Sequence, residues 1–183
     1  MNARHILFAM SRLLCLLPLL IAPAFSRAQF EPVHPPVTPK PEDVKSQDAI
    51  IKALYDVISG PIGQKRDWDR MRSLFVADAR MGAAIRTRKG DIRYIGFSVE
   101  KYIADDDKIM TEKGFFEKEL RRHSDTWANM TQVFSTYESR WKPEDPKPFE
   151  RGINSIQLMN DGKRWWVVSI FWQGEDDKAK LPR

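Results

Sequence analysis

The stretch from Phe149 to Gln173 constrains the fold more than any other part of the chain. Asp161-Gly162 lies between two apolar-rich runs there, and this dipeptide is typical of the tight turn of a β-hairpin. A two-residue turn places Leu158 opposite Trp165, and alternation along both strands then puts large apolar side chains on both faces. A sheet with one wet face does not show this pattern. We therefore predict a sheet covered by helices on one face and by a second subunit on the other.

The chain begins with a segment typical of a secretory signal, residues 1–28. Arg4 and Arg12 give it a basic start, Leu13 to Phe25 is an apolar run of 13 residues, and small residues precede cleavage near Ala28. That run is shorter than the ~20 residues that a membrane-spanning helix needs. The only cysteine, Cys15, lies inside it, so the mature chain has no thiol. We expect a secreted, periplasmic or extracytoplasmic protein without an integral membrane segment after cleavage.

Charge argues against a nucleic-acid partner. The net charge is +5, but three arginines lie in the leader with no acidic residue beside them, which leaves 27 basic and 25 acidic residues in the mature chain. The signs also alternate, as in Glu117-Lys118-Glu119. Nucleic-acid binders concentrate their basic excess, so we interpret this pattern as an ordinary solvated surface.

Three further segments follow the leader. Residues 29–45 contain five prolines and predict a semi-rigid tether, with a docking segment for another protein as the less favoured alternative. Residues 46–173 form the predicted domain. Residues 174–183 are a charged tail that we expect to fray.

Apolar periodicity and turn residues predict the elements of the domain. Three helices are expected, each with a capping residue at its start, namely Ser46, Asp67 and Ser98. The expected strands are Asp78 to Arg88, Ile92 to Phe97, Phe116 to Ala128, Thr131 to Trp141 and the two arms of the last hairpin. Because helices gather early and strands late, the pattern predicts an α+β fold of order α-α-β-β-α-β-β-β-β.

The long hairpin allows a prediction of register. A two-residue turn at Asn129-Met130 places Arg121 opposite Glu138 and Glu119 opposite Arg140. Opposite charges that face each other across two strands stabilise their pairing, so we predict two structural ion pairs.

The order of these elements, together with Leu74-Phe75-x-x-Asp78-Ala79 and Asp161-Gly162-x-x-Trp165-Trp166, resembles the nuclear transport factor 2-like superfamily in its SnoaL-like branch. The resemblance covers about residues 46–173. It implies a cone-shaped, strongly bent, mostly antiparallel sheet wrapped around the N-terminal helices. It also implies a pocket in the open mouth of the cone and a homodimer through the outer sheet face.

The resemblance does not imply one activity, because this family contains isomerases, cyclases, dehydratases and members that only bind or assemble. Its ketosteroid-isomerase-like branch has a carboxylate base five residues after the aspartate that matches Asp78. Ala83 occupies that position here and cannot transfer a proton. No isomerase residue is therefore carried over to this chain.

His123 and Asp125 are the candidate catalytic residues. They alternate onto one face of the third predicted strand, beside Glu119 and Arg121, and a histidine near a carboxylate can act as a general base. Residues two apart on a strand stand roughly 6–7 Å apart, however, which exceeds a direct hydrogen bond. A solvated histidine on a charged face is the favoured interpretation.

Polar residues of the central strands either form a closed network or line a wet pocket, and the network is favoured. The candidate pocket-lining residues are Tyr55, Trp68, Tyr102, Tyr137, Asn154 and Trp166. We predict no metal, because Asp105-Asp106-Asp107 points around a helix and the mature chain has only two histidines. No phosphate-binding loop is present, and we predict no cofactor.

The leading hypothesis is a dimeric extracytoplasmic domain that binds a small apolar or amphipathic molecule, or serves in assembly, without catalysis. The alternative is a cofactor-free isomerase, cyclase or dehydratase that uses proton transfer in the pocket, with His123 or Asp125 as base and Tyr137 as hydrogen-bond donor. A third hypothesis is a protein-interaction domain tethered by the proline-rich segment.

Overall fold

A computed structural model describes residues 37–182, and the predicted signal segment lies outside these residues. The described part forms four helices and six strands. In chain order they are α1 (Pro41–Val44), α2 (Gln47–Ile58), α3 (Trp68–Leu74), β1 (Phe75–Arg86), β2 (Ile92–Ser98), α4 (Val99–Lys113), β3 (Phe116–Trp127), β4 (Met130–Arg140), β5 (Glu150–Asn160) and β6 (Trp165–Gly174). The predicted α+β class is confirmed.

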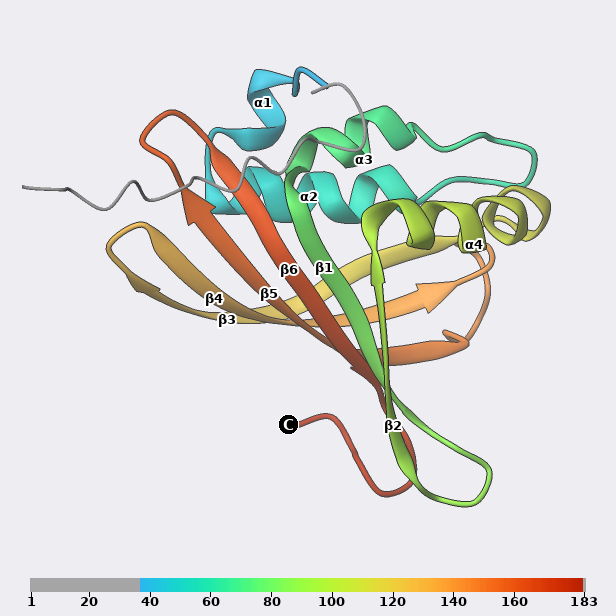
Figure 1. The fold of residues 1–183 in the computed structure, drawn as a ribbon. Coiled ribbons are helices and arrows are strands. Elements are labelled where there is room, and N and C mark those ends of the chain that lie inside the picture. The colour runs from blue at the N-terminus through green and yellow to red at the C-terminus, as the bar shows by residue number, and fades with distance from the viewer. Residues whose placement is uncertain (1–36, 183) are drawn as a thin grey trace, which may run out of the picture.

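The strands form one sheet in the order β2-β1-β6-β5-β4-β3. All neighbours are antiparallel except β1 and β6, which run parallel and join the first hairpin to the later strands. The sheet is strongly bent, and the helices lie over one of its faces (Figure 1). We call this the inner face and the opposite one the outer face. Among residues 37–182, no helix is both long and apolar enough to cross a bilayer.

Helices α2, α3 and α4 begin where the sequence predicted. The Ser46 hydroxyl accepts a hydrogen bond from the Ala49 amide at 3.1 Å, and Asp67 and Ser98 cap α3 and α4 in the same way. Gly114 follows α4 with a φ of 74°, a left-handed conformation that glycine adopts without strain. These local signals position the helices over the sheet.

The core lies between α2 and the inner face of the sheet. Ile50 and Ile51 of α2 are fully buried, as are Val133 and Val167 on the strands. Burying side chains of this size contributes roughly 1.5–3 kcal/mol each relative to leaving them exposed. The apolar stripe of α2 therefore holds the helical layer against the sheet.

The ordered domain begins earlier than the sequence suggested. Pro41–Val44, expected to be part of an extended tether, forms the short helix α1, and Val44 is buried in the core. The carboxylate of Asp43 accepts two hydrogen bonds from Arg70, at 2.7 and 2.8 Å. In the tail, Asp176 pairs with Arg86 at 2.7 Å. Both ends of the described chain are thus joined to the domain by charged pairs.

The predicted register of the long hairpin is wrong. Its turn is Ala128-Asn129, so Trp127 lies opposite Met130, and Leu120 bulges from β3. Such an extra residue shifts all later pairs and bends the strand.

As a result, neither predicted ion pair forms. Arg121 lies opposite Thr136, and Glu138 instead pairs with Lys118 at 3.1 Å and Arg140 at 3.0 Å. Glu119, the remaining predicted partner, lies on the inner face, where it pairs with Arg122 at 2.7 Å.

The last hairpin also differs from its prediction. Asn160 lies opposite Trp165, so the loop holds four residues rather than two, and Val168 bulges from β6. The bulge reverses the alternation beyond it. Ile170 and Trp172 consequently face inward, where regular alternation would have sent them outward.

Candidate functional site

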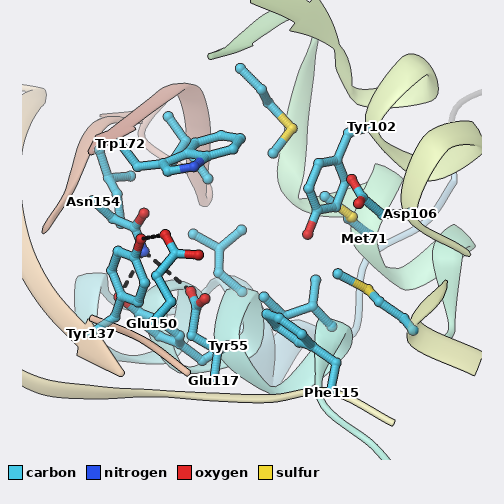
Figure 2. Close-up of a pocket in the computed structure, with 16 residues that line it drawn as sticks. Tyr55, Met71, Tyr102, Asp106, Phe115, Glu117, Tyr137, Glu150, Asn154 and Trp172 are labelled. Atoms are coloured by element: carbon cyan, nitrogen blue, oxygen red, sulfur yellow. Dashed lines mark hydrogen bonds between the residues drawn. The ribbon is translucent and has the colours of Figure 1, made fainter. Parts of the chain in front are cut away.

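A cavity of about 210 Å³ lies between the helices and the inner face of the sheet (Figure 2). Most of its wall is apolar, with polar groups gathered in two places. It is lined by Leu54, Tyr55, Ile58, Met71, Met81, Tyr102, Asp106, Met110, Phe115, Glu117, Tyr137, Glu150, Asn154, Ile156, Ile170 and Trp172. Such an apolar hollow with few polar groups is typical of a small-molecule site.

The first polar group is a network centred on Glu117 of β3. Its carboxylate accepts hydrogen bonds from Ser139 at 2.7 Å and from the amide of Asn154 at 3.3 Å. The same Asn154 amide donates to the Tyr55 hydroxyl at 3.1 Å, and that hydroxyl bonds Ser135 at 2.7 Å. The network therefore joins α2 to β3, β4 and β5.

Glu117 holds its proton unusually tightly. Burial raises its pKa from 4.5 to about 7, the hydrogen bonds from Ser139 and Asn154 oppose this rise, and the nearby charge of Glu150 adds to it. Glu117 is only partly buried as a residue, and it borders the cavity. Near neutral pH the group is therefore divided between its acid and its ionised form.

Tyr137 and Glu150 complete this end of the cavity. The Tyr137 hydroxyl donates to Glu150 at 2.7 Å. Gly152 lies opposite Tyr137, and a Cβ there would stand 2.6 Å from that hydroxyl. Glycine at this position thus allows the phenol to lie across β5 and reach the carboxylate. Burial, and then the charge of Glu150, raise the pKa of Tyr137 well above its ordinary value, so the phenol stays protonated.

The second polar place is on α4. Tyr102 and Asp106, one helical turn apart, face the cavity across from the network (Figure 2). Trp172 forms the part of the wall that lies between α4 and the network. The rings of Tyr102 and Trp172 are nearly perpendicular, at 86°, with centroids 6.5 Å apart. Burial, and then the neighbouring Asp105, raise the pKa of Asp106.

The structure brings together four of the six predicted pocket residues. Tyr55, Tyr102, Tyr137 and Asn154 all line the cavity. The other two do not.

Trp68 packs edge-on behind Tyr102 and donates to Asp107 at 2.6 Å. Trp166 points to the outer face, where Arg164 stacks on its ring and Asp161 accepts from its indole at 2.8 Å. Both tryptophans therefore support the structure from outside the cavity.

The candidate catalytic pair lies elsewhere. His123 and Asp125 are on the outer face of β3, with side chains 76% and 80% exposed, and their side chains lean together to 3.2 Å. Ala83 is buried between Ile95 and Trp172. Neither the predicted pair nor Ala83 supplies a titratable group to the cavity.

Sequence reasoning missed Glu117 and Glu150. Glu117-Lys118-Glu119 was interpreted as solvated surface, but Glu117 and Glu119 face inward and only Lys118 faces outward. One sequence signal did indicate an inward polar face: Ser135, Tyr137 and Ser139, all able to form hydrogen bonds, alternate along β4. Pairing them with Glu117 and Glu119 required the β3–β4 register, which the Leu120 bulge sets.

Metal binding has no support in the described part of the chain. Within residues 37–182, no three His, Cys, Asp or Glu side chains converge as ligands.

No protein-family model matches the sequence, and no curated protein matches it significantly. Solved structures do match by fold. A proposed dehydratase from the NTF2-like family, from Streptomyces avermitilis, aligns with a TM-score of 0.52 and 12% identity over 73% of this chain and 96% of that one. A protein of unknown function with a cystatin-like fold, from Nostoc punctiforme, aligns with a TM-score of 0.51 and 9% identity over 70% of this chain and 90% of that one. At these identities the similarity establishes the fold alone, and the protein has the nuclear transport factor 2-like (NTF2-like) fold.

Proposed function

We propose that the protein binds a small, largely apolar molecule with a polar end in the cavity, without chemistry of its own. The observation that carries the proposal is an apolar hollow that ends in a hydrogen-bonded network. A volume of about 210 Å³ corresponds to about seven waters at ~30 Å³ each, or a ligand on the order of ten non-hydrogen atoms. Apolar walls supply affinity in such a site, and the polar end fixes orientation.

The state of the polar groups favours binding over catalysis. The hydroxyls of Tyr55 and Tyr137 are already hydrogen-bonded to neighbouring side chains. A closed network is rigid and keeps its shape when a ligand enters.

A pair of matched variants tests the proposal. Ile58→Trp adds a large ring to the cavity wall, whereas Ile62→Trp adds the same ring at a site that is 57% exposed. The probe is 2-phenylethanol, observed by saturation-transfer NMR. We expect binding to the parent chain and to Ile62→Trp, and none to Ile58→Trp. Equal binding to all three proteins would refute the cavity as the site, with circular dichroism showing that each variant is folded.

A second subunit on the outer face is part of the proposal. Trp127, Met130 and Phe134 are 74%, 55% and 50% exposed on that face. Apolar patches of this kind on a sheet mark interaction surfaces. Light scattering on the chain from Gln29 should give twice the monomer mass, and Phe134→Lys should give the monomer mass. A parent chain that runs as a monomer at tens of micromolar contradicts this part.

The extracytoplasmic location is likewise proposed from the leader. Protein recovered from the periplasm or the medium should begin at Gln29 on N-terminal sequencing. Recovery of the chain only inside the cell, with Met1 or Asn2 first, would overturn it.

Proton transfer is the second candidate, and one observation favours it. Glu117 has a pKa of about 7, which suits a general acid or base at neutral pH. The relevant carboxylate is therefore Glu117, not the exposed His123 and Asp125. The test is exchange of the α-hydrogens of cyclohexanone in D₂O, which should be catalysed by the parent chain and not by Glu117→Gln. Equal rates in both would exclude this role.

A further inference from the structure

We propose that the ligand of this cavity is a small organic cation, with its ammonium group in the volume that Glu117, Glu150 and Asp106 line and against the rings of Tyr102 and Trp172. The inference rests on the proposed binding function and adds the chemical class of the ligand.

Charge in the cavity has one sign. Three carboxyl groups line it, and none of the lining residues is Lys, Arg or His. The negative charge of Glu150 adds to the rise in the pKa of Glu117, because two negative charges in one apolar volume repel each other. A cation between them removes that repulsion, whereas an anionic ligand would add to it.

Arg66 does not neutralise this charge. Its guanidinium acts on the phenol of Tyr102, but it does not line the cavity. Its donors are taken up by backbone carbonyl oxygens, those of Ile58, Gln64, Gly60 and Met110. The acidic character of the cavity therefore remains without an internal counter-charge.

The aromatic walls provide an independent reason. The perpendicular rings of Tyr102 and Trp172 form a corner of the cavity. A cation within about 6 Å of a ring centroid is attracted to the ring face, more strongly where water is excluded. An ammonium group in this corner would therefore be attracted to a ring face while it lies close to the second ring.

Two polar groups at this corner have no partner among the described residues. The Tyr102 hydroxyl, enclosed enough that burial raises its pKa, points into the cavity (Figure 2). Asp106 makes neither a hydrogen bond nor an ion pair there, in contrast to Asp105, which pairs with Lys101, and Asp107, which accepts from Trp68. Both side chains keep some accessible surface and border the cavity, so a bound cation would lie close to two oxygen-bearing groups to which no other described residue hydrogen-bonds.

The test compares choline with 3,3-dimethylbutan-1-ol, its neutral isostere in which carbon replaces the charged nitrogen. Apolar contacts and size are then equal, and only the charge differs. We expect choline to bind the parent chain at least about tenfold more tightly, as measured by NMR titration. In the double variant Glu117→Gln/Glu150→Gln the two affinities should become equal. The control Glu138→Gln, on the outer face, should keep the parent preference.

The pH dependence gives a second readout, because choline has no group that titrates near neutrality. Its affinity should rise several-fold from pH about 6 to about 8 as Glu117 ionises, and Glu117→Gln should abolish this rise. The titratable groups that face Glu117 from the surrounding elements are Tyr55, Tyr102, Asp106, Tyr137 and Glu150.

Each outcome decides a separate question. If the neutral isostere binds as tightly as choline, the ligand is not a cation, and the proposed binding function stands. If neither compound binds but 2-phenylethanol does, the cation inference is overturned and the binding function stands again. If none of the three binds, both fall.

Discussion

The two faces of β4 are made from alternating residues of one strand, yet they provide opposite environments. On the inner face Val133 and Ser135 are fully buried, and Tyr137 closes one end of the cavity. On the outer face Phe134 is half exposed and Glu138 lies between two cations. What a side chain does in this domain depends first on which way it points and only then on its type.

Two glutamates show the consequence most clearly. Glu117 and Glu138 lie on the adjacent strands β3 and β4. Burial raises the pKa of Glu117 to about 7, whereas hydrogen bonds from Lys118 and Arg140 outweigh the effect of burial and lower the pKa of Glu138. One sheet thus holds a carboxyl group that resists ionisation and another that favours it.

The largest predicted difference between the faces concerns packing. Leu158→Ala, at an inner position that is 1% exposed, should lower the free energy of unfolding by about 2–5 kcal/mol because it leaves a cavity. Phe134→Ala, half exposed on the outer face, should cost less than about 1 kcal/mol in the monomer. Urea denaturation at two protein concentrations measures both.

Concentration makes this comparison sharper. If the outer face carries a second subunit, the cost of Phe134→Ala should grow with protein concentration, and the cost of Leu158→Ala should not. Equal costs at both positions would mean that the outer face is packed as tightly within one chain as the inner face, which would contradict the division drawn here.

The second prediction concerns pH and has opposite signs on the two faces. Glu117→Gln should stabilise the protein by about 1–3 kcal/mol at pH about 8 and by little at pH about 5. Glu138→Gln should instead destabilise it at neutral pH, by less than about 1 kcal/mol, because it removes a partly exposed ion pair. Denaturant unfolding across this pH range is the measurement.

The signs follow from proton binding. Between its ordinary value near 4.5 and about 7, Glu117 holds more proton in the folded than in the unfolded state, so its contribution to stability falls as pH rises. In the folded state the pKa of Glu138 is lowered. Its contribution to stability is therefore present at pH values above its ordinary pKa, and it is lost as the pH falls through the lowered pKa of the folded state. Parallel pH profiles for the two variants would contradict the assignment of faces.

Local signals in the sequence predicted α2, α3 and α4 and the fold class correctly, but they did not predict α1. Ser46, Asp67 and Ser98 each cap a helix through their own side chain, and this chemistry depends only on neighbouring residues. The parallel pair of β1 and β6 was not predicted, because it joins segments about ninety residues apart and no turn residue records it.

The site was harder to predict because it depends on two bulges. Leu120 and Val168 each insert one residue into a strand and exchange the faces of everything beyond. This is why Glu119 could be grouped with His123 although they lie on opposite faces, and why Trp172 lines the cavity although regular alternation would place it on the same face as Trp166. Tyr55, Tyr102, Tyr137 and Asn154 were identified because they lie where no bulge intervenes.

The smallest predicted effect concerns the turn that sets the β3–β4 register. Ala128 has a φ of 49°, a left-handed conformation that costs a residue with a Cβ about 1 kcal/mol and costs glycine little. Ala128→Gly should therefore raise the free energy of unfolding by up to about 1 kcal/mol, although glycine also gains entropy in the unfolded chain. Ala104→Gly is the matched control, since Ala104 is an exposed position of α4. Glycine there should lower the free energy of unfolding by about 1 kcal/mol. If Ala128→Gly were as destabilising as Ala104→Gly, the turn would not lie at Ala128-Asn129. The register of β3 would then change, and with it the inward position of Glu117 on which the cavity chemistry depends.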